Sequence, residues 1–319
     1  MKKSKDNYPP VDLSRVRRYS VKKRPNKTET ASFGKPLSQK GCARNFLESL
    51  PDFLKAKDFK EFIDLTVEAR RKGRPFHLLM GAHTIKVGLS PIIIDLMKQN
   101  IVTGVSFNGA GLVHDLELAF FGGTSEDVQA GLADGSFGMV KETSELYAAV
   151  VNRAAEKKIG LGKAAGEFID GEKAPYRKIS IFAAAHRLDS TATLHIGIGT
   201  DIVNQHPDFD AAKAAEASYL DFRVFSSVCA QIDRGGVVAN IGSAVILPEV
   251  FLKALTVARN LNRGRSRLTT ANFDMLEHYR PRVNVVNRPT LNAGKGFDFR
   301  GHHEIMIPLL AWGLKASFK

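Results

Sequence analysis

The chain has 319 residues, of which 44% are apolar and 25% are charged, a composition typical of a globular protein with one large α/β domain or two smaller ones. No run of residues approaches the roughly 20 apolar positions that span a bilayer, and the Lys-rich N-terminus lacks the apolar stretch of a secretory signal. The two cysteines, Cys42 and Cys229, cannot build a disulfide framework and show no metal-ligand spacing, so we expect a protein of the reducing cytoplasm.

The first segment, residues 1–40, is polar, contains proline and carries most of the net charge of +13. Such a segment is typical of a flexible tail rather than of a folded unit. Two interpretations stay open: the tail binds RNA through its charge, or it is solvated or docks on a partner subunit. We expect the remaining residues, 41–319, to form a single domain, and we expect no membrane partner.

The next part of the chain alternates helix-like and strand-like segments. Asp58 is the expected N-cap of one helix, and Pro91 is expected in the first turn of another or at a kink. The expected strands are 75–82 and 103–110. The expected helices are 42–56, 58–73, 85–100, 111–122 and 141–158, with short helices within 124–138.

The second half repeats this alternation. Asp210 is the expected start of a helical stretch, and Pro248 is allowed in the first turn of a later helix. The expected strands are 191–201, 235–244, 270–276 and 280–290, and the expected helices are 177–189, 210–232, 247–261 and 302–314.

At least five strands separated by helices predict an α/β fold, with a Rossmann-like, mostly parallel sheet covered by helices on both faces. In open sheets of this kind, ligands bind beyond the carboxyl ends of the strands, at a topological switch point. The residues that follow the predicted strands are therefore the candidates for a binding site.

Four strand exits combine glycine with polar residues directly after an apolar run: MGAHTIK (80–86), FNGAGLVHD (107–115), HIGIGTD (195–201) and NIGSAVILPE (240–249). Glycine allows sharp turns and close approach of a ligand, and amides at a helix start suit phosphate or carboxylate. None of the four is a complete GxGxxG motif. We expect several exits together to bind a nucleotide-sized ligand, through His83, Asn108, Gly109, Ala110, Gly111, Gly197, Gly199, Asp201, Gly242 and Ser243.

Histidines gather near these exits, where their titration near neutral pH suits acid–base chemistry. We expect His114 and Asp115 to act in this way, and we expect His77 and His186 to be structural. A zinc or iron site built from His302, His303 and Glu304 is an alternative, but no HxH or HxxxH pair supports it. No metal is therefore predicted.

Lys253 lies four residues after Glu249 in a strongly apolar helix. The pair is interpreted either as a surface salt bridge or as part of a catalytic site. In the second interpretation, a desolvated Lys253 would have a lowered pKa and would form an imine or act as a base.

These segments resemble the deoxyhypusine synthase family in order and spacing over most of residues 45–260. The first exit reads MGAHTIKVGLSP, and GAGLVHDL (109–116) is similar to the family's second turn. GIGTD (197–201) places Asp201 on the family's aspartate. Gly242, Ser243, Glu249 and Lys253 follow the order of its last segment.

The resemblance implies an NAD-dependent transferase, a homotetramer in the family, which moves the aminobutyl group of spermidine through a lysine imine. The two glutamates of the family's second turn fall here on Val113 and His114. The binding turn from Asn108 to Gly111 argues for the fold, whereas the loss of the acidic pair argues against spermidine as the substrate. We expect an NAD-binding enzyme acting on an amine-containing small molecule.

Two other functions stay open on the sequence alone. The same exits suit a lyase or isomerase of an anionic metabolite. The basic tail suits a non-enzymatic protein that binds a ligand or RNA. The apolar segment IMIPLLAWGL with Trp312 is either a core helix or an oligomer interface.

Overall fold

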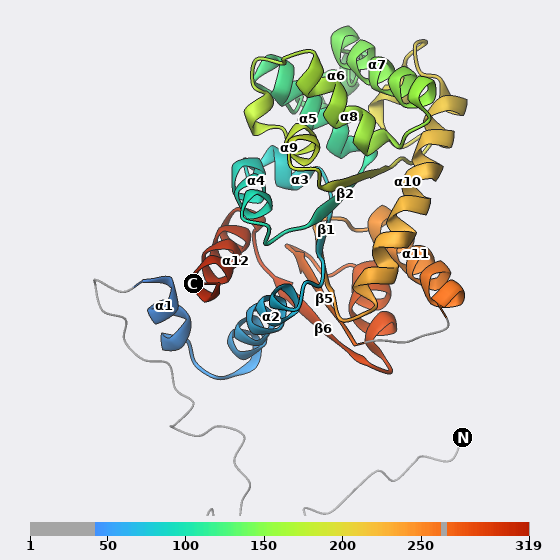
Figure 1. Ribbon diagram of the computed structural model, residues 1–319. Coiled ribbons are helices and arrows are strands. Elements are labelled where there is room, and N and C mark those ends of the chain that lie inside the picture. The colour runs from blue at the N-terminus through green and yellow to red at the C-terminus, as the bar shows by residue number, and fades with distance from the viewer. Residues whose placement is uncertain (1–41, 263–266, 319) are drawn as a thin grey trace, which may run out of the picture.

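The computed structural model describes residues 42–262 and 267–318. Its centre is one sheet of six strands in the order β3-β2-β1-β4-β5-β6, and every neighbouring pair is parallel (Figure 1). The strands are β1 (Phe76–Met80), β2 (Gly104–Asn108), β3 (Thr191–His195), β4 (Val237–Ile241), β5 (Leu268–Asp274) and β6 (Gly294–Arg300). The predicted α/β class and Rossmann-like sheet are confirmed.

Connections between consecutive strands contain α-helices, except that β5 and β6 are joined by a π-helix and a 3-10 turn. The helices are α1 (Ala43–Ser49), α2 (Leu54–Arg71), α3 (His83–Lys86), α4 (Ser90–Lys98), α5 (Gly109–Phe121), α6 (Val128–Asp134), α7 (Lys141–Lys157), α8 (Leu161–Gly171), α9 (Ile181–Arg187), α10 (Ala211–Ile232), α11 (Ile246–Asn262) and α12 (His303–Ser317). The shorter turns are η4 (Arg177–Ile179), η5 (Ile202–Gln205), η6 (Pro281–Asn287) and η7 (Arg288–Thr290).

The sheet is covered on both faces, as predicted. Phe225 of α10, Phe251 of α11 and Val285 of η6 form one buried cluster with Leu79 and Val238 of the sheet. The larger cluster on the opposite face contains apolar residues of α2, α4, α5, α7, α8, α9 and α12. Strands β1, β4 and β5 contribute residues to both clusters, because successive strand side chains point to opposite faces.

Several predicted element boundaries agree with the structure. Pro91 lies in the first turn of α4, and the Asp210 side chain caps α10 by accepting from the Lys213 amide at 3.0 Å. The structural role expected for His77 is also found, since its buried ring bonds to Ser106 Oγ at 2.8 Å.

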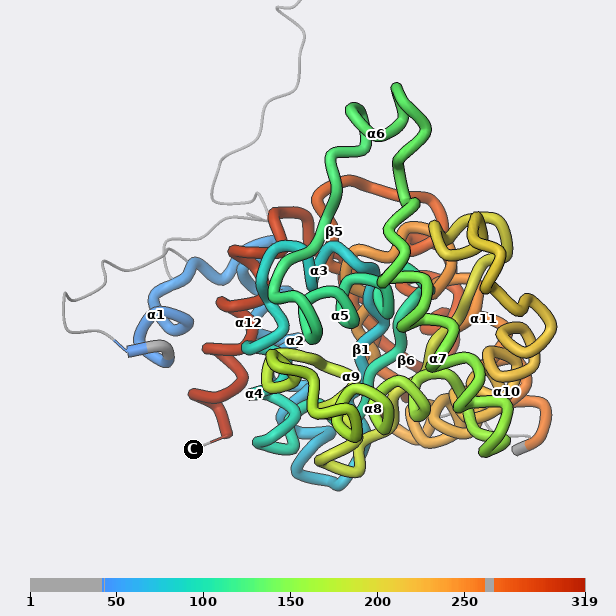
Figure 2. Tube along the Cα trace, turned by 90° about the horizontal axis from the view of Figure 1, so that it is seen from above, coloured from blue at the N-terminus to red at the C-terminus, as the bar shows by residue number. Residues whose placement is uncertain are grey.

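Several predictions about elements are wrong. Asp58 lies inside α2, which already begins at Leu54 after Phe53. Residues 280–290 form η6 and η7 rather than a strand, and Pro281 begins the π-helix. The last strand is instead β6, whose two glycines at 294 and 296 hide the strand pattern. The expected short helix within 124–138 is α6, which extends away from the body (Figure 2) and has no buried residue.

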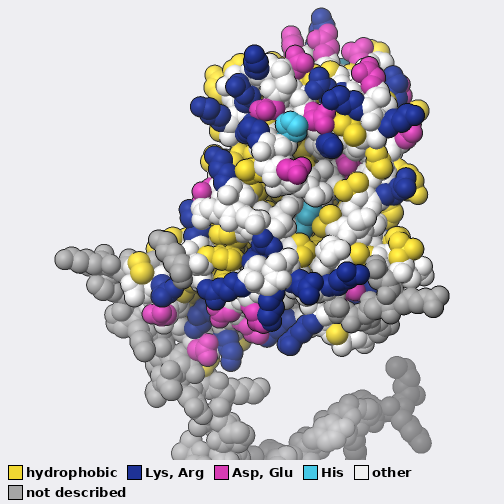
Figure 3. All heavy atoms as spheres, in the orientation of Figure 1, with side chains coloured by type: hydrophobic (Ala, Val, Ile, Leu, Met, Phe, Trp, Pro, Cys, Tyr) yellow, Lys and Arg dark blue, Asp and Glu magenta, His cyan; other side chains and the backbone are white. Residues whose placement is uncertain are grey.

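The expected tail, residues 1–40, lies outside the described residues. On the face shown in Figure 3, basic and acidic side chains of the described residues lie side by side. Within 42–262 and 267–318, no helix combines the length and the apolar character needed to cross a bilayer. Trp312 of α12 is 44% exposed and its ring lies 5.8 Å from that of Phe46.

Candidate functional site

The topological switch point lies between β1 and β4. The chain leaves β1 toward α3 and α4 on one face of the sheet, and it leaves β4 toward α11 on the other face. In such sheets the crevice outside the strand ends at this point is the usual ligand site. Two of the four predicted exits, 80–86 and 240–249, therefore border this point directly.

The two exits at the switch point touch through glycine backbones. A methyl group added at Gly81 would lie 2.1 Å from the carbonyl oxygen of Gly242. Gly242 itself has φ +65°, a left-handed conformation that disfavours other residues, and a methyl group there would lie 2.8 Å from Cε1 of His303. The glycines thus let the two strand exits pack directly against each other and against the ring of His303.

The start of α11 presents unpaired amides at the same place. Ser243 is 3% exposed, and its Oγ accepts from the Leu247 amide at 3.2 Å, which caps the helix. The amides of Ala244, Val245 and Ile246 have no hydrogen-bond partner among the described residues. A 17-residue helix that begins with free amides offers an anion site there.

The exit after β2 is built differently, because a carboxylate of the chain already occupies it. Asn108 caps α5 by accepting from the Gly111 amide at 3.3 Å. Asp201 accepts from the amides of Ala110 and Gly197, the latter at 3.4 Å. A methyl group at Gly109 would lie 1.9 Å from Asp201 Oδ2.

The expected binding of a dinucleotide by Gly109, Ala110 and Gly111 therefore needs correction. The negative charge at this helix start is Asp201, which is only 7% exposed and whose pKa is raised to about 6 by burial. Asp201 ties the exit of β3 to α5, and it does not face outward toward a ribose hydroxyl.

The exit after β3 adjoins the start of α11. A methyl group at Gly197 would lie 3.5 Å from Cδ1 of Ile246. Gly199 has φ +82°, and its amide donates to Asn204 Oδ1 at 2.6 Å. Between them Ile198 is 60% exposed. This loop is the third segment, after the exits of β1 and β4, that borders the switch point.

His83 also borders this crevice. It begins α3, it is half-buried, and its ring has no hydrogen-bond partner among the described residues. Its ring lies edge-on to that of His303, with the centroids 5.3 Å apart. The structure thus places His83, Gly242 and Ser243 of the expected binding set together.

His114 belongs to a buried clip rather than to the crevice. Its Nδ1 bonds to Thr124 Oγ1 at 2.6 Å and lies 3.7 Å from Glu117. Glu117 also accepts from the hydroxyls of Thr124 and Thr143. Burial opposes ionisation of Glu117, but these hydrogen bonds prevail and lower its pKa. The clip joins α5 to the loop after it and to α7.

Asp115 is completely buried and caps another helix. Its carboxylate accepts from the amides of Ile181 and Phe182 at 2.9 and 3.4 Å and from Ser180 Oγ at 2.5 Å. Burial raises its pKa to about 6, against the opposing effect of these donors. Asp115 thus anchors α9, and this buried arrangement gives no support to the acid–base role expected for it.

Lys253 is not desolvated by its helix. Its side chain is 58% exposed and pairs with Glu249, which also binds Asn284 at 2.9 Å and Arg280 at 3.2 Å. These partners lie on or beside η6, which packs on β5 and β6, whereas His114 packs beyond β2. The geometry of Lys253 and Glu249 is that of the surface salt bridge. The structure does not bring Lys253 close to His114. The formation of an imine on Lys253 therefore stays a prediction.

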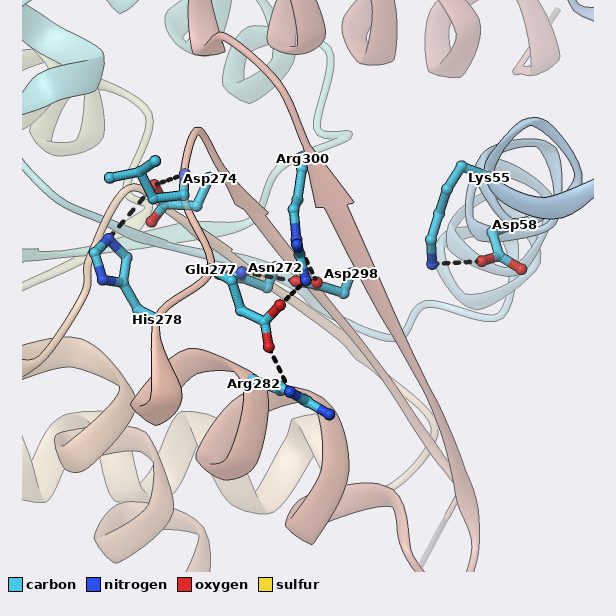
Figure 4. Close-up of polar contacts among 10 residues, drawn as sticks. Lys55, Asp58, Asn272, Asp274, Glu277, His278, Arg282, Asp298 and Arg300 are labelled. Atoms are coloured by element: carbon cyan, nitrogen blue, oxygen red, sulfur yellow. Dashed lines mark hydrogen bonds and ion pairs between the residues drawn. The ribbon is translucent and has the colours of Figure 1, made fainter. Parts of the chain in front are cut away.

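Polar residues at the carboxyl ends of β4, β5 and β6 were not predicted from the sequence. Asn240 donates to Asn272 at 2.8 Å, and Asn272 donates to Asp298 at 2.9 Å, as a ladder across the three strands. Figure 4 shows the outer part of this ladder, with His278 close to Asp274 and with Glu277 between Arg282 and Arg300. Their side chains come into register only once the strands pair.

Two further observations concern alternative sites. Among residues 42–262 and 267–318, no three His, Cys, Asp or Glu side chains are grouped so as to hold a metal ion. A cavity of about 310 Å³ lies at the opposite end of the sheet, near Thr191 at the start of β3. Since ligands of such sheets bind beyond the carboxyl ends, we place the candidate site at the switch point.

No protein-family model and no curated protein matches the sequence. Solved structures match the fold. A "putative deoxyhypusine synthase" from Entamoeba histolytica is 10% identical, with a TM-score of 0.55 over 90% of this chain and 97% of that chain. A "conserved putative LOR/SDH protein" from Methanococcus maripaludis S2 is 12% identical, with a TM-score of 0.50 over 95% and 76%.

The third neighbour is AgrE in a ternary complex with ornithine and NAD⁺, which is 12% identical with a TM-score of 0.53. The alignment covers 81% of this chain but only 33% of AgrE. At these identities the similarity shows the fold alone. The chain therefore has a divergent deoxyhypusine-synthase-like fold, as the resemblance of its strand exits predicts.

Proposed function

We propose that this protein is an enzyme that binds NAD at the β1/β4 switch point and acts on a small, amine-containing substrate. The observation that carries the proposal is the set of unpaired amides from Ala244 to Ile246, at the start of α11 and beside the Gly81–Gly242 contact. Helix starts of this kind bind the phosphates of dinucleotides in Rossmann-like sheets.

The residues at the switch point fit this cofactor. The amides of Ala244, Val245 and Ile246 would hold the pyrophosphate, and the Gly81–Gly242 contact holds the two strand exits together beside them. His83 and the exposed loop at Ile198 border the same space. When bound, NAD supplies a hydride acceptor, and the protein orients the two reactants.

The amine class of the substrate rests on similarity. The family that the sequence resembles acts on an amine, and the AgrE complex holds ornithine together with NAD⁺. The positions of the family's two glutamates give no support for spermidine, because Val113 is buried and His114 is bonded within its clip. The transferase type and the homotetramer are parts of the proposal that rest on the resemblance, and the cytoplasmic location is a part that rests on the two cysteines.

Calorimetric titration of NAD⁺ into the purified protein tests the proposal. We expect saturable binding with one site per chain, and we expect inorganic phosphate to compete only at much higher concentration, because it fills only the amide site. Binding of phosphate without any binding of NAD⁺ would favour an enzyme of an anionic metabolite instead.

A further inference from the structure

His303 has a buried ring nitrogen without a partner beside the switch point. The residue is 1% exposed, and its Nε2 lies 3.1 Å from the carbonyl oxygen of Phe273. Its Nδ1 has no hydrogen-bond partner among the described residues. Buried polar atoms in native proteins are nearly always paired, so this atom needs an explanation.

The protonation of this ring follows from its neighbours. A carbonyl oxygen only accepts hydrogen bonds, so Nε2 carries the hydrogen. Burial lowers the pKa of His303, although Phe273 and Asp274 oppose the shift. The ring is thus neutral at physiological pH, and its Nδ1 is an acceptor that offers a lone pair.

The surroundings of the ring place it at the switch point. It packs on Gly242, where a methyl group would lie 2.8 Å from Cε1 and 3.5 Å from Nδ1. Its other cover is His83, whose ring has no hydrogen bond of its own to hold it. The segment after Gly242 carries the unpaired amides. Gly242 and His83, which contact this ring, therefore both border the proposed ligand.

We propose that Nδ1 of His303 accepts a hydrogen bond from a neutral donor of the bound dinucleotide, either the carboxamide N–H or a ribose O–H. This inference rests on the proposed function. The pyrophosphate of the dinucleotide is excluded as the partner, because at neutral pH it is fully ionised and offers only acceptors to an atom that is itself an acceptor. His303 is thus a positioning residue that fixes which end of the dinucleotide lies over β1 and β5, while the amides of α11 hold the phosphates.

The acceptor also supports binding energetically. A buried acceptor that is unpaired in the free protein is unfavourable there, and a ligand donor removes this disadvantage on binding. The ligand would reach the atom by displacing the His83 ring. The role of Nδ1 can be tested separately from that of Nε2, because the amide of glutamine can replace Nε2 and the amide of asparagine can replace Nδ1.

The test compares His303→Gln with His303→Asn. The amide of glutamine reaches the position of Nε2 and can still donate to Phe273, whereas the amide of asparagine reaches the position of Nδ1. We expect His303→Gln to weaken NAD⁺ binding about tenfold with an unchanged melting temperature. We expect His303→Asn to melt at a lower temperature but to bind NAD⁺ within about twofold of wild type, since an acceptor is retained.

The same titrations of wild type and His303→Gln, repeated with ADP-ribose in place of NAD⁺, identify which group of the dinucleotide donates to Nδ1. Weakened binding of NAD⁺ but not of ADP-ribose indicates the carboxamide, and weakened binding of both indicates a ribose hydroxyl. If wild type and His303→Gln bind NAD⁺ equally, the role of His303 is wrong while the proposed function stands. If His303→Asn binds as weakly as His303→Gln, the ring acts only in packing, which also overturns it. If wild type binds no NAD⁺, the proposed function fails and this inference fails with it.

Discussion

Replacing Asp115 with alanine should lower the free energy of unfolding by about 3 kcal/mol. The substitution leaves the amides of Ile181 and Phe182 and the hydroxyl of Ser180 without their acceptor in a site that water does not reach. Each buried donor left unpaired costs about 1 kcal/mol or more. Urea denaturation followed by circular dichroism measures this difference.

Asp208→Ala is the matched control, because Asp208 is exposed and has no hydrogen bond or ion pair among the described residues. It should change the free energy of unfolding by no more than about 0.5 kcal/mol. If Asp115→Ala were as stable as this control and lost only ligand binding, Asp115 would be a site residue after all.

The second large effect is a dependence of the free energy of unfolding on pH, which arises from Asp221 of α10. Its carboxylate is 2% exposed and accepts from the amides of Gly162 and Leu194, each at 2.9 Å. Burial raises its pKa from 3.8 to about 7 despite these donors. Between these two values the folded protein keeps a proton that the unfolded chain has released. The free energy of unfolding should therefore fall as pH rises through this window, by at most about 1.4 kcal/mol per pH unit.

Denaturation of wild type and Asp221→Asn between pH 4 and pH 8 isolates this contribution, because asparagine does not titrate. Asp115 and Asp201, whose pKa values are raised to about 6, contribute in the same direction in both proteins and cancel in the comparison. Wild type should lose stability relative to the variant from pH 4 to pH 7 and then level off. A relative gain with rising pH would show that the pKa of Asp221 is lowered.

Much of the fold was predictable because its signals are local. Apolar strands of five residues, such as β1 and β4, stand between amphipathic helices with clear caps such as Asp210. The four predicted exits follow β1, β2, β3 and β4 and therefore lie at one edge of the parallel sheet. Where local pattern and tertiary packing disagree, prediction failed. The alternating valines of 280–290 resemble a strand but form η6, where Pro281 starts the turn.

The candidate site was only partly predictable, because side-chain partners are distant in sequence. Asp201 meets Ala110 only after β2 and β3 pair, so its occupation of the α5 start could not be inferred from either segment. The apolar neighbours of Lys253 suggested burial, yet Lys253 shares an exposed helix face with Glu249 four residues earlier. The adjacent histidines at 302 and 303 were noticed as metal ligands, whereas the unpaired Nδ1 emerged only with the fold.

The central claim, that NAD binds the free amides at the start of α11, is tested most directly at Ile246. Proline is tolerated at the first position of a helix, so Ile246→Pro removes one amide hydrogen at little expected cost to the fold. Ile246→Ala removes the same side chain but keeps the amide. In parallel calorimetric titrations with NAD⁺, we expect Ile246→Pro to bind at least about tenfold more weakly than Ile246→Ala. Equal affinity of these two variants would contradict the claim.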